Sequence, residues 1–141
     1  MRRDADAIER MGAVPLFAAC GRRELGLVAR TFIELPVPAG RVLLRRGAPG
    51  RSFIVLLDGS AVVRVADRPL TRLQAGDFAG ELAVLGRRCH HADVVAETDL
   101  AVLECTGAEL VGLLHDAPGL TRTMLTALAT RLSVADRALV A

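Results

Sequence analysis

The sequence contains no lysine, tryptophan or tyrosine, so all 18 of its basic residues are arginine. These arginines are spread along the 141 residues, which indicates genomic composition rather than a single basic surface. The 16 acidic residues leave a formal net charge of +2. A charge this small does not by itself indicate binding to nucleic acid or to a membrane surface.

Long hydrophobic runs are also missing. No apolar run approaches the roughly 18 residues that span a bilayer, and the N-terminus, MRRD, lacks the apolar stretch of a secretory signal. The composition, 52% hydrophobic and 24% charged, is typical of a globular protein. We therefore expect a cytoplasmic, soluble protein without a membrane partner. Its length predicts one domain over residues 1–141.

Cysteines are few and their pattern is uninformative. They are Cys20, Cys89 and Cys105, an odd number without Cys-x-x-Cys spacing, which predicts neither a disulfide framework nor a zinc site. Cys89 precedes His90, His91 and Asp93, but adjacent ligands in an extended stretch point to alternating sides. A nucleophilic Cys–His pair would need further groups that nothing in the sequence supplies. We expect no bound metal and no enzymatic activity.

Hydrophobic periodicity divides the chain into three segments. Residues 1–34 repeat apolar side chains at spacings of three and four, which predicts N-terminal helices separated at Gly21. Residues 35–105 contain short apolar runs separated by Gly, Pro and Asp, which are typical of β-barrel strands. The predicted strands are 42–44, 53–57, 61–66, 70–73, 92–96 and 101–103. Helical periodicity returns over 107–141, so the predicted fold is mainly β with flanking helices and a long C-terminal helix.

The last predicted helix begins near Pro118, which suits a first helical turn. Its apolar residues form a narrow seam with alternating spacings of three and four: Leu125, Leu128, Leu132, Ala135 and Leu139. Two heptads are fewer than the three or four that identify a coiled coil. A homodimer seam and packing against the rest of the chain remain equally open.

The segment 76–94 has the composition of an anion site. Gly80 precedes a short helical stretch, and free backbone N–H groups at such a position attract phosphate. Glu81 does not suit a phosphate, but it suits the hydroxyls of an attached sugar, and the two together indicate a nucleotide. The alternative is that Glu81 only complements the helix dipole, and the local sequence taken alone favours this alternative.

Spaced glycines and apolar residues recur in three further stretches. The first reads GRV at 40–42 and GAPGRSFIVLLDGSAV at 47–62, the second reads GDFAGELA at 76–83, and the third reads VVAETDLAVL at 94–103. Further along the chain, at spacings that continue the same pattern, come Leu110, Leu113, Pro118 and the pair Arg131-Leu132. Over about residues 12–135 the chain resembles the cyclic nucleotide-binding domain family of the catabolite activator protein, protein kinase A regulatory subunits and cyclic nucleotide-gated channels.

This resemblance implies a double-stranded β-helix, or jelly-roll-like barrel, with a phosphate-binding cassette at 76–94. By position, Glu81 would accept the ribose 2′-hydroxyl, and backbone N–H groups near Leu82 and Ala83 would face the phosphate. The C-terminal helix would close over the purine through Leu132, Ala135 and Asp136, although an exposed surface carboxylate is an equal interpretation of Asp136. The implied ligand is cyclic AMP or cyclic GMP, with no other cofactor.

The cassette departs from the family pattern at its phosphate-binding end. The family has an arginine nine residues after the glutamate, followed by a small residue, an alanine and Thr or Ser, whereas this chain has His90, His91, Ala92 and Asp93. Histidine lacks the permanent charge and the fork of a guanidinium. Losing a charge-assisted hydrogen bond of about 1.5–3 kcal/mol predicts binding weakened roughly ten- to a hundredfold or more.

An inward Asp93 would weaken binding further, because like charges about 4 Å apart cost on the order of 4 kcal/mol at an effective dielectric near 20. Two compensations are open. Asp93 pairs with His90 or His91 and keeps an imidazolium charged, or Arg87 or Arg88 turns in from the loop.

Two functions follow as hypotheses. The first is a non-catalytic, ligand-sensing regulatory module that binds a cyclic nucleotide weakly and acts through a dimer or partner contact. The second is a degenerate domain that binds no cyclic nucleotide and serves dimerisation or protein interaction. Transcription factors of this family carry a helix-turn-helix after the final helix. Because this sequence stops at Ala141, we do not expect the chain to bind DNA unless it is a fragment of a longer protein.

Overall fold

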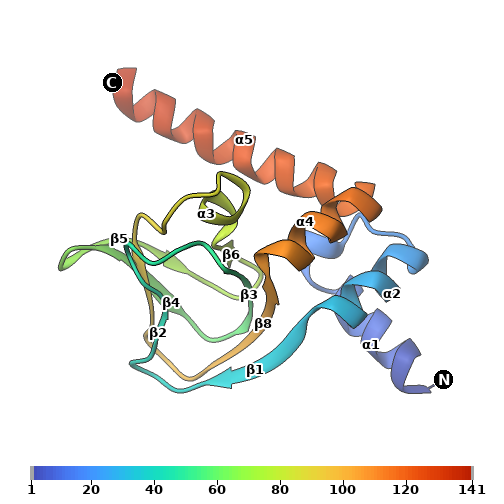
Figure 1. Cartoon of the computed structure of the whole chain (residues 1–141). Helices are drawn as coiled ribbons and strands as arrows, with labels where there is room; N and C mark the ends of the chain where they lie inside the picture. The colour runs from blue at the N-terminus through green and yellow to red at the C-terminus, as the bar shows by residue number, and fades with distance from the viewer. Residues whose placement is uncertain (1, 141) are drawn as a thin grey trace. The chain divides into compact units, whose positions relative to one another are not determined.

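The computed structural model describes residues 2–140, and the side chains of residues 5–135 (Figure 1). In chain order the elements are α1 (Arg2–Gly12), the 3-10 turn η1 (Pro15–Phe17), α2 (Arg22–Thr31), β1 (Ile33–Val37), β2 (Val42–Leu44), β3 (Ser52–Asp58), β4 (Ala61–Val65), β5 (Arg68–Leu73), β6 (Phe78–Ala79), α3 (Glu81–Leu85), β7 (Asp93–Ala96), β8 (Leu100–Thr106), α4 (Gly107–Asp116) and α5 (Pro118–Val140). They form two compact units, a β unit over Arg30–Gly112 and a helical unit of Met1–Ala29 with Leu113–Ala141.

The β unit consists of two four-stranded sheets with antiparallel pairing. Their strand orders are β1-β8-β3-β6 and β2-β7-β4-β5. Side chains alternate between the two faces of a strand, so each sheet turns one apolar set inward. This core contains Val37, Leu44, Ile54, Leu56, Ala61, Leu73, Val94, Ala96, Leu100 and Val102. The predicted mainly β barrel with flanking helices is confirmed.

Two strands were missed by the sequence pattern. β1 begins at Ile33, whereas helix was expected as far as residue 34, and β6 is only two residues long. β1 is an edge strand whose first four residues are exposed, so it lacks the apolar alternation of a half-buried strand. Pro36 is tolerated there because an edge strand can leave one backbone position unpaired.

Phenylalanines pack on the face of β3 opposite to the barrel core, since Phe53 alternates with the core residues Ile54 and Leu56. The Phe53 ring lies 6.1 Å from that of Phe32 and 5.7 Å from that of Phe78, measured between centroids. Phe32, which was expected in a helix, directly follows α2 and is buried. These tilted contacts position β6, and the cassette that follows it, on β3.

The helical unit is joined by contacts between its two sequence segments. Glu24 accepts a hydrogen bond from the Gly119 N–H at 2.8 Å, which satisfies one of the donors at the start of α5. Arg23 Nη2 donates to the Asp116 carbonyl oxygen at 3.1 Å. Burial, with Glu24 nearby, raises the pKa of Cys20 to about 11, so this thiol stays protonated.

The seam predicted along α5 is largely accessible. Leu125 and Leu132 are each 62% exposed, and Leu128 is partly buried. The side chain of Leu139 lies outside those described. Among the described residues, no helix has both the length and the apolar character needed to cross a membrane.

Candidate functional site

The cassette crosses β3 at Gly80, the residue that precedes α3. Gly80 has a φ of 98°, in the left-handed region that L side chains rarely adopt. A Cβ atom built on it would lie 2.5 Å from the Ser52 carbonyl oxygen. Both the turn and the close approach therefore require glycine, and together they fix where α3 begins.

Two polar side chains are buried in the described part of the chain, Glu81 and His90. Glu81 is 2% exposed and opens α3, whereas His90 is 8% exposed and follows it. An acidic residue near a helix N-terminus stabilises the helix by about 0.3–1 kcal/mol when it is exposed, so the dipole role does not require burial. Burying a carboxylate is costly, so burial favours the ligand role of Glu81 over the dipole role.

His90 is held by backbone hydrogen bonds on both sides. Its N–H donates to the Ala48 carbonyl at 2.9 Å, and its carbonyl accepts from the Gly47 N–H at 2.8 Å. Burial lowers the pKa of His90 below the ordinary value of 6.5, and the neighbouring His91 lowers it further. His90 is therefore neutral at pH 7 in the free chain, with a fixed backbone.

Asp93 lies on the other face of its strand. In β7 the side chains of Val94 and Ala96 belong to the barrel core, so Asp93, one residue earlier, points away from it. Its Oδ1 accepts a hydrogen bond from the Arg46 backbone N–H at 2.7 Å. Among the described residues Asp93 forms no ion pair with either histidine, so the first compensation is not seen. The repulsion expected for an inward Asp93 does not apply to this geometry.

The other cassette residues separate by exposure. Ala83 and Ala92 are buried, at 4% and 6% exposed. Leu82 is 54% exposed and His91 is also exposed. The roles expected for the N–H groups of Leu82 and Ala83 remain predictions.

The lid residues belong to the helical unit. Leu132 and Ala135 are exposed on α5, and the side chain of Asp136 lies outside the described residues. Their approach to a purine also remains a prediction.

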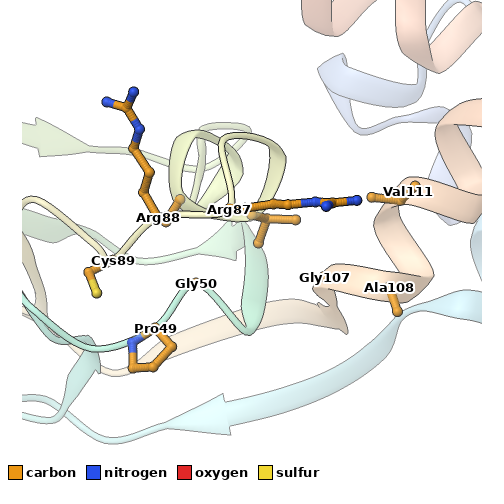
Figure 2. Close-up of a pocket in the computed structure, with 10 residues that line it drawn as sticks. Pro49, Gly50, Arg87, Arg88, Cys89, Gly107, Ala108 and Val111 are labelled. Carbon is orange, nitrogen blue, oxygen red and sulfur yellow. The ribbon is translucent and has the colours of Figure 1, made fainter.

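Sequence reasoning missed a cavity within the β unit that the cassette lines in part, termed the outer cavity (Figure 2). Its volume is about 460 Å³, and Arg87, Arg88 and Cys89 contribute to its lining. In Figure 2 the Arg87 side chain runs toward Val111, whereas the Arg88 side chain turns away from Val111. No local sequence pattern marks this cavity, because the small residues Gly50, Ala83 and Gly107 are far apart in the sequence and approach one another only in the fold.

Among the described side chains, those of residues 5–135, His, Cys, Asp and Glu do not gather in groups of three or more that would hold a metal ion. Cys89 is an exposed free thiol. Cys105 is buried, and burial raises its pKa to about 12.

Comparison with known proteins identifies the class. Residues 34–117 match the model of the cyclic nucleotide-binding domain, and the chain belongs to this family. The chain is 32% identical over 114 residues to a cyclic nucleotide-gated potassium channel of Rhizobium etli, covering 81% of this chain and 32% of the channel. It is 35% identical over 91 residues to a cAMP-dependent protein kinase regulatory subunit of Aspergillus fumigatus, covering 63% of this chain and 22% of that subunit.

The fold matches solved members as well. The catabolite activator protein of Thermus thermophilus superposes with a TM-score of 0.80 at 25% identity, over 89% of this chain and 61% of that chain. The chain spans about a third or less of the length of the potassium channel and of the kinase regulatory subunit that it matches in sequence. The resemblance drawn from the spaced glycines is confirmed.

The close approach at Gly80 gives a stability prediction. Gly80→Ala forces an L side chain into the left-handed region and against the Ser52 carbonyl, so we expect the free energy of unfolding to fall by at least about 2 kcal/mol. Gly112→Ala is the matched control, because Gly112 lies in α4 and a Cβ atom built on it would meet nothing within 4 Å. It should stabilise by about 0.5–1 kcal/mol. Urea unfolding measures both, and equal effects would contradict the packing described.

Proposed function

We propose that this chain is a non-catalytic, ligand-sensing module whose cassette binds a cyclic nucleotide, cyclic AMP or cyclic GMP, with reduced affinity. The observation that carries the proposal is the burial of Glu81 and His90, nine residues apart, at the family's ribose and phosphate positions. Membership of the family supports the ligand class. Its regulatory relatives support a sensing role rather than catalysis.

Glu81 is suited to the ribose. A buried carboxylate accepts hydrogen bonds from a sugar hydroxyl at short range, and such charge-assisted bonds contribute about 1.5–3 kcal/mol each. The same carboxylate repels a phosphate, so the ligand orients with its sugar hydroxyl toward Glu81. This part of the family's recognition is intact in the sequence.

His90 is suited to the phosphate only when it is protonated. In the free chain its lowered pKa leaves the ring neutral, with one N–H donor in place of a charged fork. A bound phosphate would stabilise the imidazolium and raise the pKa of His90 in the complex. Binding is then coupled to uptake of a proton, which lowers the affinity at neutral pH.

The first prediction concerns pH. Because the pKa of His90 is higher in the complex than in the free chain, affinity for cyclic AMP should rise as pH falls from 8 to 6. The rise is at most about tenfold per pH unit between the two pKa values. Isothermal titration calorimetry at both pH values, with cyclic GMP in parallel, measures it. Affinity that is equal at pH 6 and pH 8 would contradict the role of His90.

Adenosine provides the control for that titration, because it carries the base and sugar without the phosphate. Its affinity should not change between pH 8 and pH 6. A parallel rise for adenosine would assign the pH effect to another group.

The second prediction concerns the missing guanidinium. His90→Arg places a permanent charge at the phosphate position, so affinity for cyclic AMP should rise at least about tenfold and become independent of pH. His91→Arg is the matched control, since it adds the same charge at the exposed neighbouring position and should change affinity little. Equal gains from both variants would mean that only the overall charge matters. Asp93 is left unchanged because its carboxylate holds the Arg46 N–H.

The apolar seam of α5 favours a second candidate function, a homodimerisation module that binds no cyclic nucleotide. Leu125 and Leu132 share the predicted seam and are both largely exposed. Large apolar side chains repeated along one helix face are more costly in water than isolated ones, and a second copy of the helix would cover them.

Light scattering after size exclusion tests this candidate. The wild-type chain should elute as a dimer at tens of micromolar, and the double variant Leu125→Glu/Leu132→Glu should be monomeric because it places charges in the seam. Leu70→Glu, at a residue that is 60% exposed in β5, should leave the dimer intact. A wild-type monomer at all concentrations would exclude the candidate.

A further inference from the structure

The outer cavity of the cassette is built from three segments of the β unit. The loop before β3 contributes Pro49 and Gly50, and α4 contributes Gly107, Ala108 and Val111. The cassette contributes Ala83, Val84, Arg87, Arg88 and Cys89. Its volume of about 460 Å³ falls within the range of roughly 300–1,000 Å³ typical of small-ligand sites. Glu81 and His90 are not part of its lining, whereas Ala83, whose N–H is expected to face the phosphate, contributes to it.

The floor of this cavity is apolar and closely built. A Cβ atom on Gly50 would lie 2.5 Å from the Ala83 carbonyl carbon, and one on Gly107 would lie 3.1 Å from Val84 Cγ1. The segments therefore cross with only hydrogen atoms between them at these points. Val111 stands at the side of the cavity and is 54% exposed. An apolar group entering the cavity would cover this exposed surface.

The charge at the cavity has one sign. Arg87 and Arg88 are its charged lining residues, and no carboxylate lines it. Within the described part of the chain neither guanidinium has an ion-pair partner. On α4, Glu109 lies in sequence between the lining residues Ala108 and Val111, but it is not part of the lining. Its carboxylate accepts a hydrogen bond from the Thr106 N–H at 2.9 Å in a capping box.

Arg87 is the better placed of the two arginines. Its side chain extends alongside the cavity toward Val111 (Figure 2). Its φ of 52° lies in the left-handed region, which glycine or asparagine occupies at lower cost. The Arg88 N–H donates to the Ala83 carbonyl at 2.8 Å, which closes the loop that carries Arg87. A strained backbone at a residue that presents a charge to a cavity is a pattern found at binding sites.

We propose that this cavity is a second ligand site, which binds a small organic anion: a phosphate or carboxylate group on an apolar body. Arg87 pairs with the anionic group through its guanidinium fork, and the apolar body lies against Ala108 and Val111. The proposal uses neither Glu81 nor His90, although part of the cassette, including Arg87, lines the cavity.

The test is a titration of the ¹⁵N-labelled chain followed by NMR. Phenyl phosphate and phenylacetate are the two anionic probes, and benzyl alcohol is the uncharged control. We expect the amides of residues 87–89 and 107–111 to shift with either anion, and benzyl alcohol to bind at least about tenfold more weakly. Comparing the two anions shows whether phosphate or carboxylate is the preferred group.

Variants assign the shifts to the cavity. Arg87→Asn removes the charge and suits the left-handed backbone, so affinity for the preferred anion should fall at least about tenfold. Arg68→Gln, at an exposed arginine in β5 outside the cavity, should change nothing. Ala108→Leu fills the cavity and should abolish the shifts at 87–89, while thermal unfolding checks that each variant is folded.

Three results would overturn the proposal: equal affinity for benzyl alcohol, no change on Arg87→Asn, or shifts confined to the amides of Glu81 and His90. Shifts confined to Glu81 and His90 would place the anion at the cyclic nucleotide position. Cyclic AMP binding measured on Ala108→Leu separates the two sites, since it should be unchanged although the outer cavity is filled.

Discussion

The contact between the cassette and β3 at Gly80 is the constraint on which the site depends. Only a residue without a Cβ atom takes a φ of 98° there and leaves room for the Ser52 carbonyl. At this approach Glu81, the first residue of α3, is buried, although Leu82 beside it is exposed. If Gly80 lay farther from β3, Glu81 would be at the surface, where a carboxylate in the first turn of a helix interacts only with the helix dipole.

Burial changes what the two polar residues of the cassette do. For His90 it lowers the pKa, so that the free site holds a neutral ring where the family pattern has a cation. A group that is buried and neutral binds a phosphate only by taking up a proton or by donating one hydrogen bond. On the function proposed above, the cassette would keep its sugar contact, and its phosphate contact would depend on pH. The permanently charged side chains of the cassette, Arg87 and Arg88, line the outer cavity instead.

The sequence was sufficient for the barrel, because turn glycines and apolar runs recur at strand spacing and the core residues alternate. It was insufficient for β1, whose exposed edge position leaves no alternation to detect. It singled out Glu81 and His90 by spacing, and both are buried, although their roles stay predictions. The orientation of Asp93 depends on which face of β7 joins the core, and the strand boundary decides that. The outer cavity was invisible for a similar reason: it forms where three distant segments cross, and no local pattern encodes their crossing.

The central claim is that His90 lies where the ligand phosphate binds, as a neutral ring that becomes charged in the complex. Its direct measurement is the NMR titration of the His90 imidazole, in the free chain and in the chain saturated with cyclic AMP. The account predicts a pKa below 6.5 in the free chain and a higher pKa in the complex, with His91 little changed. An identical His90 titration in both states, under conditions where cyclic AMP is bound, would contradict it.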